Sequence, residues 1–122
     1  MRLQESGEMY LEAIYVLSQK NSKVRSIDVC DYLGYSKPSV SRAMGLLKQA
    51  GLVVMDSGDN HLTLTPEGLA TAKKIYDRHT VLSAALVKLG VDPETAAEDA
   101  CKMEHVISDQ TLSALQRFVA EK

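Results

Sequence analysis

The sequence of 122 residues is poor in aromatic side chains, with no tryptophan, one phenylalanine and an aromatic content of 5%. Sheet sandwiches draw on aromatic and β-branched side chains, so this scarcity favours a helical protein packed by Leu, Ala, Val and Met. Two cysteines, Cys30 and Cys101, do not make a disulfide framework and indicate reduced thiols in a cytoplasmic protein. No stretch approaches the roughly 18 apolar residues of a membrane span, and no leader pattern opens the chain.

Helical spacing and capping signals dominate the first half of the sequence. Apolar residues follow helical spacing over residues 5–20, and residues 23–25 are expected to connect this helix to the next one. Ser26 is placed to cap that short second helix, and Ser36 to cap a third helix at about residues 37–50. Two helices joined by a short glycine-containing turn predict a helix-turn-helix.

The segments that follow predict a wing and then a helical region. Residues 53–55 and 61–64 are expected to form two strands around a turn-rich loop, which makes the helix-turn-helix a winged helix. Three further helices are expected: about 66–89, from Asp92 through His105, and from Ser108 onward. We therefore predict a mainly α fold, with a winged helix-turn-helix at 1–65 and a helical region at 66–122.

The third predicted helix has a local excess of positive charge in a chain whose formal net charge is −2. Residues 36–55 contain no Asp or Glu, and the front of the helix is dense in hydroxyls, which bind phosphates, and in Lys and Arg. An ordinary solvated helix face is the alternative, and the attached hairpin makes us favour DNA. In the wing, the negative charges of Asp56 and Asp59 would repel phosphates. His61 is therefore the only candidate DNA contact in the wing that can carry a positive charge. The candidate DNA-binding residues are Ser36, Lys37, Pro38, Ser39, Ser41, Arg42, Lys48 and His61.

A second group of residues carries metal-donor atoms. Cys101, Glu104 and His105 occupy positions i, i+3 and i+4 of a predicted helix, so their donors share one face. Each donor taken singly has a plainer explanation, core packing for sulfur and solvent exposure for the others. Donors on three helices, including two of only three histidines, favour a metal. Sulfur, imidazole and carboxylate together suit Fe(II) first, Mn(II) second and Zn(II) third. The candidate ligands are Met9, Glu12, His79, Cys101, Glu104 and His105.

Several segments together resemble the diphtheria-toxin-repressor-like, iron- and manganese-dependent bacterial repressors. The similar segments cover the first helix, the recognition helix, the join of wing and long helix, the long-helix histidine and the fifth helix: residues 8–15, 37–41, 64–68, 78–79 and 100–109. The resemblance implies that residues 1–65 are a DNA-binding domain and that residues 66–122 are a helical metal-binding and dimerisation domain. It implies a homodimer that binds a palindromic operator once loaded with a divalent metal. It also implies a main site of Met9, Cys101, Glu104 and His105, with His79 at or beside it.

The resemblance also has points of departure. Met9 and Cys101 are similar to iron-type members, whereas Glu12 is similar to manganese-type members, so the ligand set looks mixed. Ser83 stands where iron-type members carry a glutamate of an ancillary site, and the SH3-like third domain of many relatives is not expected here.

Two apolar stripes, one on the long helix and one on the last, are candidates for a dimer interface, and about half of their residues are expected to be core instead. They comprise Leu82, Ala85, Leu86, Leu89, Leu112, Leu115, Phe118 and Val119.

We therefore predict a metal-dependent repressor of metal-homeostasis genes, with double-stranded operator DNA as a partner and without a membrane partner. One alternative is a metal-independent winged-helix regulator that senses an organic ligand or thiol oxidation through Cys101. The other is a small metalloenzyme with Glu104 or Glu12 as base. It ranks last because the sequence supplies no nucleophile pair, so we predict that the protein is not an enzyme.

Overall fold

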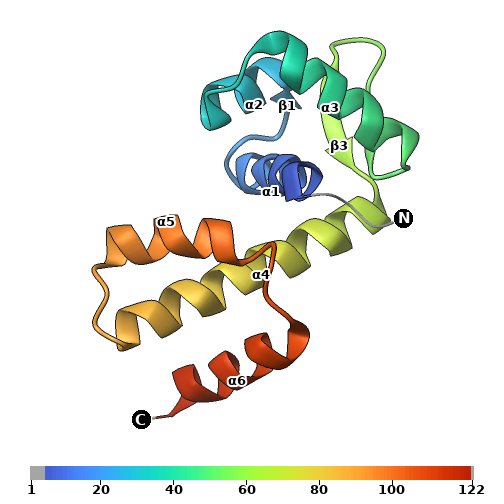
Figure 1. Ribbon diagram of the computed structural model, residues 1–122. Helices are drawn as coiled ribbons and strands as arrows, with labels where there is room; N and C mark the ends of the chain where they lie inside the picture. Colours follow the sequence, from blue (N-terminus) through green and yellow to red (C-terminus); the bar gives the residue numbers. More distant parts are fainter. Residues whose placement is uncertain (1–4, 122) are drawn as a thin grey trace. The chain divides into compact units, whose positions relative to one another are not determined.

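The computed structural model describes residues 5–121, with side chains from residue 7 onward (Figure 1). The expected fold class, mainly α with an N-terminal winged helix-turn-helix, is confirmed. None of the helices in the described range has both the length and the apolar character that a membrane crossing requires. The elements in chain order are α1 (Glu5–Lys20), β1 (Val24–Arg25), α2 (Ser26–Leu33), α3 (Lys37–Gln49), β2 (Val53–Met55), β3 (His61–Leu64), α4 (Pro66–Lys88), α5 (Pro93–Met103) and α6 (Asp109–Ala120).

The chain divides into two compact units, residues 1–73 and 74–122, and the division falls inside α4. The sequence-based division between residues 65 and 66 stays a prediction. It lies at the start of α4, whereas the division between the two units lies within that helix.

The sheet of the N-terminal unit contains one strand that the sequence did not reveal. Residues 23–25 were expected to be a connection, but β1 pairs antiparallel with β3, so that the strand order is β1-β3-β2. The register places Val24 opposite Leu62, and both side chains are buried. A two-residue strand is too short to show an alternating pattern, so only its partner reveals it.

The helix-turn-helix is shaped by its caps. α2 ends at Gly34, whose φ of 73° is the left-handed conformation that glycine adopts most readily. The Ser36 side chain accepts a hydrogen bond from the Ser39 N–H at 3.3 Å and caps α3 as expected. The expected cap of α2 was wrong by one residue. Arg25 is the N-cap, and its N–H donates to the Asp28 carboxylate at 2.8 Å, so that Ser26 is the first helical residue.

The core of the N-terminal unit joins helices to the sheet. Leu11 and Ile14 of α1 pack in one cluster with side chains of α2, α3 and the strands, and Cys30 is buried among them as expected. Where the wing meets α4, the Gly68 N–H donates to the Thr65 hydroxyl at 3.0 Å. A Cβ on Gly68 would lie 2.0 Å from the Leu52 carbonyl oxygen, so only glycine allows this close approach.

The C-terminal unit has a core of small residues and leucine. Leu82 and Ala85 of α4 and Ala96 and Ala100 of α5 are each at most 1% exposed, which indicates close helix packing. α5 ends at Met103, two residues earlier than expected, because the Met103 carbonyl accepts from the N–H groups of residues 106 and 107 in a turn that leads into α6.

Candidate metal centre and nucleic-acid interface

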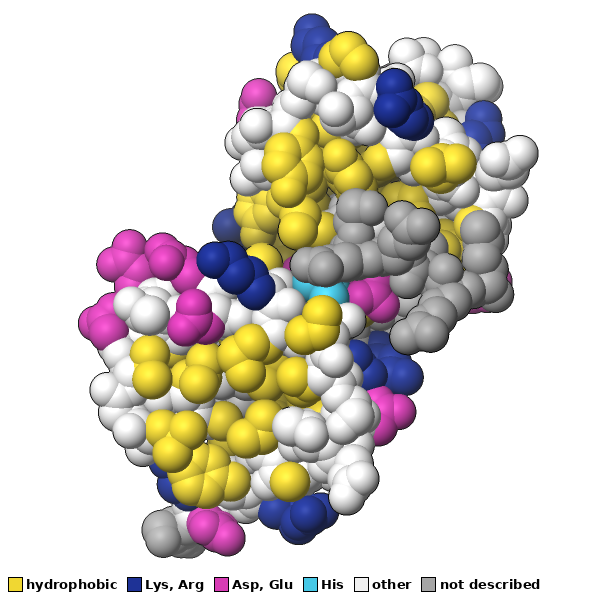
Figure 2. Space-filling model, viewed as in Figure 1, with side chains coloured by type: hydrophobic (Ala, Val, Ile, Leu, Met, Phe, Trp, Pro, Cys, Tyr) yellow, Lys and Arg dark blue, Asp and Glu magenta, His cyan; other side chains and the backbone are white. Residues whose placement is uncertain are grey.

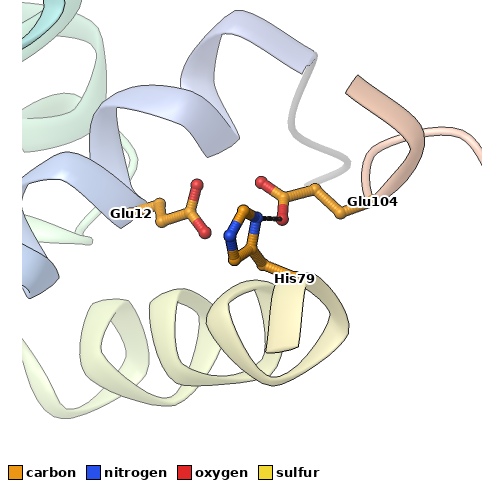
Figure 3. Close-up of side chains that lie close together, drawn as sticks. All are labelled: Glu12, His79 and Glu104. Atoms are coloured by element: carbon orange, nitrogen blue, oxygen red, sulfur yellow. Dashed lines mark ion pairs between the residues drawn. The ribbon is translucent and has the colours of Figure 1, made fainter. Parts of the chain in front are cut away.

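A buried carboxylate lies between two imidazoles in the C-terminal unit. The Nδ1 atom of His79 is 3.2 Å from one oxygen of Glu104, and the Nε2 atom of His105 is 3.3 Å from the other. Figure 3 shows the first of these ion pairs, with His79 projecting from α4 toward Glu104. The Glu104 side chain is fully buried. The structure therefore brings together three of the predicted ligands.

The hydrogen bonding of Glu104 is compatible with a cation ligand. Among the described residues, neither of its carboxylate oxygens accepts a hydrogen bond, although both are buried. A buried carboxylate is costly without a partner, and its contacts with the two imidazoles have ion-pair distances without hydrogen-bond geometry. A divalent cation bound by one carboxylate and neutral imidazole nitrogens would satisfy the charge, so these residues fit a metal.

The turn after α5 sets the position of these donors. Glu104 keeps a helical φ and ψ and donates its N–H to the Ala100 carbonyl at 3.0 Å, whereas His105 lies in the turn that follows. Cys101 lies one helical turn before Glu104 and is half-buried. The sequence spacing had suggested that these three residues share one continuous helix. The structure shows instead that the helix ends before His105.

Arg78 is a positioning residue that the donor pattern could not reveal, because a guanidinium does not ligate metals. Its Nη1 donates to the Glu104 carbonyl oxygen at 3.2 Å, and its Nη2 donates to the Asp109 carboxylate at 2.6 Å. Arg78 thereby ties α4 to the turn that carries the donors and to the first residue of α6. In the sequence, only its position next to His79 pointed to a role for Arg78 at the site.

The remaining predicted ligands lie in the N-terminal unit. Met9 and Glu12 project from α1, and Figure 3 also draws Glu12. The Met9 sulfur accepts a hydrogen bond from the Tyr35 hydroxyl at 3.1 Å. Their role as metal ligands stays a prediction.

The predicted recognition helix has a buried and an exposed face. Val40, Met44 and Leu47 of α3 are in the core, which turns the polar residues outward. A helix whose outward face carries hydroxyls and cations suits the major groove and its phosphates. The exposed candidates are Ser36, Lys37, Pro38, Ser39, Ser41, Arg42 and Lys48.

The remaining DNA candidate, His61, is engaged within the wing. Its Nδ1 lies 2.5 Å from the Asp59 carboxylate and 3.6 Å from that of Asp56. The Lys23 ammonium also contacts Asp59, at 2.8 Å, and the Arg25 guanidinium donates to the Asp59 carbonyl at 3.1 Å. Lys23 first, and His61 second, hold the pKa of the Asp59 carboxyl well below its usual range. Lys23 and Arg25 therefore offset the negative charge of the wing. The sequence order did not reveal these contacts.

The fold and the donor set together define a class: a winged helix-turn-helix transcriptional regulator with a metal-type carboxylate and imidazole cluster in a separate helical unit. The sequence matches the description "Iron dependent repressor, N-terminal DNA binding domain" over residues 2–61 and "Iron dependent repressor, metal binding and dimerisation domain" over residues 65–121. The chain belongs to the iron dependent repressor family, so the resemblance found in the sequence is confirmed.

Similar proteins support this assignment. An uncharacterized HTH-type transcriptional regulator of Methanocaldococcus jannaschii is 34% identical over 119 residues, which cover 96% of this chain and 94% of that protein. The transcriptional regulator MntR of Escherichia coli O157:H7 is 36% identical over 109 residues, covering 89% of this chain and 70% of the relative. The structure of the manganese regulator SloR superposes with a TM-score of 0.81 at 28% identity, over 98% of this chain.

The chain spans about half of the SloR chain, 54%. The prediction that the protein is not an enzyme is confirmed by its relatives, which are DNA-binding regulators. The family is one of metal-dependent transcriptional repressors, with a domain that binds DNA and a domain that binds metal and dimerises.

Proposed function

We propose that this protein represses metal-homeostasis genes by binding a palindromic operator as a homodimer when loaded with Fe(II) or Mn(II). The observation that carries the proposal is Glu104, a buried carboxylate flanked by two imidazoles and, within the part of the chain that the structure describes, without a hydrogen bond at either oxygen. Such a group is costly in a metal-free protein and is expected of a ligand. Because operator DNA is in the cytoplasm, we expect the repressor to act there.

Six residues are proposed to hold the ion, two of them with sulfur donors. Thioether and thiolate sulfur suit borderline ions, and imidazole and carboxylate suit Fe, Mn and Zn alike, so Fe(II) is favoured over Mn(II) and Zn(II). The resemblance to the manganese regulator SloR and the carboxylate of Glu12 support Mn(II) as the second choice. The bound cation would supply charge neutralisation and fixed ligand directions. The proposed ligands are Met9, Glu12, His79, Cys101, Glu104 and His105.

The DNA contact is proposed to rest on the exposed face of α3. Arg42 is exposed and is suited to a guanine edge, and the Ser36 cap leaves the first amides of the helix beside hydroxyls that can bind phosphate. Dimers of this kind place two recognition helices about 34 Å apart, one turn of DNA.

The dimer contact is proposed to use the apolar residues of the C-terminal unit that the single chain leaves accessible. Apolar side chains gather on the face of this unit that Figure 2 shows. Leu89 is 65% exposed, whereas Leu82 and Ala85 are buried within the chain itself and are expected to support the interface from beneath. The accessible set is Leu86, Leu89, Leu112, Leu115, Phe118 and Val119.

The mechanism we propose is a population shift. Ligands from α1, from α4 and from α5 with the turn that follows it, all bound to one ion, would favour those arrangements of the DNA-binding units that match two successive half-sites. An ion can shift this equilibrium only by its difference in affinity for the competing arrangements.

Operator binding titrated with Fe(II), Mn(II) and Zn(II) under anaerobic conditions tests the proposal. The metal-loaded protein should bind operator DNA as a dimer, and EDTA should abolish binding. A reduced protein that binds in EDTA and releases DNA on oxidation would instead support the thiol-sensor alternative.

A further inference from the structure

Tyr35 connects a proposed metal ligand to the helix-turn-helix. Its hydroxyl donates to the Met9 sulfur at 3.1 Å, a contact between residues 26 positions apart. Tyr35 follows Gly34, the C-cap of α2, and precedes Ser36, the N-cap of α3. One side chain of the turn therefore reaches back to α1.

The ring of Tyr35 is held from a second side. It packs edge-to-face on Tyr10, with the ring centroids 5.9 Å apart and an interplanar angle of 65°. Tyr10 is only 7% exposed, so it is a fixed support, whereas Tyr35 is 42% exposed and would otherwise move freely. Adjacent residues of α1 thus hold the same tyrosine, one through its ring and one through its hydroxyl.

A thioether sulfur has two lone pairs and is a weak acceptor. If one lone pair accepts the Tyr35 proton, the other remains for a cation. A methionine side chain has three rotatable bonds, so holding its sulfur in one place before an ion arrives removes an entropy cost from binding. A movement of the sulfur toward an ion would in turn pull on the residue that precedes the cap of α3.

We infer that Tyr35 positions the Met9 sulfur for the metal and transmits the occupancy of that ligand to the first turn of α3, an inference that rests on the proposed function. Tyr35 is a positioning residue and touches no ion itself. The contact lies within the N-terminal unit, so the link from ligand to recognition helix needs no contact with other parts of the chain. Because coupling is reciprocal, DNA that fixes the turn would also favour metal binding at Met9.

The first test observes the contact without metal. In the full chain labelled with [methyl-13C]methionine, Met9→Leu assigns the Met9 methyl signal among the five methionines. Tyr35→Phe should move that signal, whereas Tyr32→Phe, which removes a hydroxyl from neighbouring α2, should leave it in place. A Met9 signal that Tyr35→Phe does not move overturns the inference.

The second test compares a thiophilic ion with a hard one. Tyr35→Phe should weaken Cd(II) binding by about threefold to tenfold, which is the effect of one modest hydrogen bond. The same change should alter Mn(II) affinity, measured by electron paramagnetic resonance, by less than about twofold. In a Met9→Leu background the same change should no longer affect Cd(II) affinity. An equal loss in both backgrounds overturns the inference.

The third test follows the signal into α3. Cd(II) should shift the amide resonances of Ser36 and Ser39 in the unmodified chain and shift them much less in Tyr35→Phe, and equal shifts would contradict the transmission. The proposed function fails separately, if the unmodified chain binds neither ion. If the ions bind and the Met9 methyl signal ignores Tyr35, only the inference fails.

Discussion

Arg78 of α4 and Asp109 of α6 form an ion pair, with 2.6 Å between Nη2 and Oδ1. The same guanidinium donates to the carbonyl of Glu104, so one side chain fixes both the donor-bearing turn and the start of α6. Only the planar fork of arginine can make both contacts at once. The metal affinity of the protein should therefore depend on a residue that does not bind metal.

Arg78→Lys should lower metal affinity by about tenfold and cost about 1 kcal/mol of stability, because lysine cannot bridge the Glu104 carbonyl and the Asp109 carboxylate together. Isothermal titration with Mn(II) and chemical unfolding measure the two effects. Arg117→Lys, at an exposed position of α6, is the control and should change neither. An unaltered metal affinity in Arg78→Lys would show that Arg78 does not position the metal ligands.

Glu104→Gln should abolish metal-induced stabilisation and leave the metal-free protein at least as stable as before. The amide keeps the shape of the side chain and removes a buried charge that accepts no hydrogen bond from residues 5–121. Thermal unfolding with and without Mn(II) checks both statements. Glu98→Gln, exposed on α5, should retain the response to Mn(II). A strongly destabilised metal-free Glu104→Gln would indicate a structural role instead.

Arg42→Ala should weaken operator binding by about fivefold or more, because an arginine contact to a guanine edge contributes about 1–3 kcal/mol. Its metal affinity should stay unchanged, since Arg42 is exposed on α3 in the N-terminal unit. Cys101→Ala and His105→Ala should lower metal affinity and, as a consequence, lose metal-stimulated DNA binding without unfolding. Fluorescence anisotropy and metal titration on the same samples measure both affinities, and an equal loss of DNA binding and of metal affinity in Arg42→Ala would refute the division of roles.

Asp59→Asn should lower the melting temperature at neutral pH, because Lys23 and His61 hold the pKa of this carboxyl well below its usual range. A group whose pKa is depressed in the folded state stabilises the fold above about pH 4 and loses that effect as the pH falls through the depressed value. The difference in melting temperature between variant and parent should therefore narrow from about pH 5 to pH 2. Asp31→Asn, exposed on α2, should give no such trend, and a constant difference for Asp59→Asn would count against the ion pairs.

Gly68→Ala should destabilise the protein by about 1–3 kcal/mol or more, because the new Cβ would lie 2.0 Å from the Leu52 carbonyl oxygen. Gly45→Ala is the matched control inside α3, where a Cβ would meet nothing within 4 Å. That change should stabilise by about 0.5–1 kcal/mol, since alanine favours a helix interior more than glycine does. Urea unfolding compares the two, and an equal effect of both would contradict the close approach.

Much of the fold could be predicted because its signals are local. Caps such as Ser36, stops such as Gly34 and the 3.6-residue spacing of apolar side chains each act within a few residues, so the helices and the wing followed from sequence order. β1 could not be predicted, because two residues form a strand only when a partner such as β3 pairs with them. The end of α5 was missed because a turn competes with the helix for the Met103 carbonyl.

For the site, the sequence determined which donor atoms exist: their types are local chemistry, and they favoured a metal before any fold was known. Tertiary structure alone decided that Glu104 is buried between His79 and His105, that Arg78 holds its carbonyl, and that Tyr35 contacts the Met9 sulfur. Burial and side-chain contacts arise between residues tens of positions apart, and the free energy of such packing is not encoded in the spacing of any one segment.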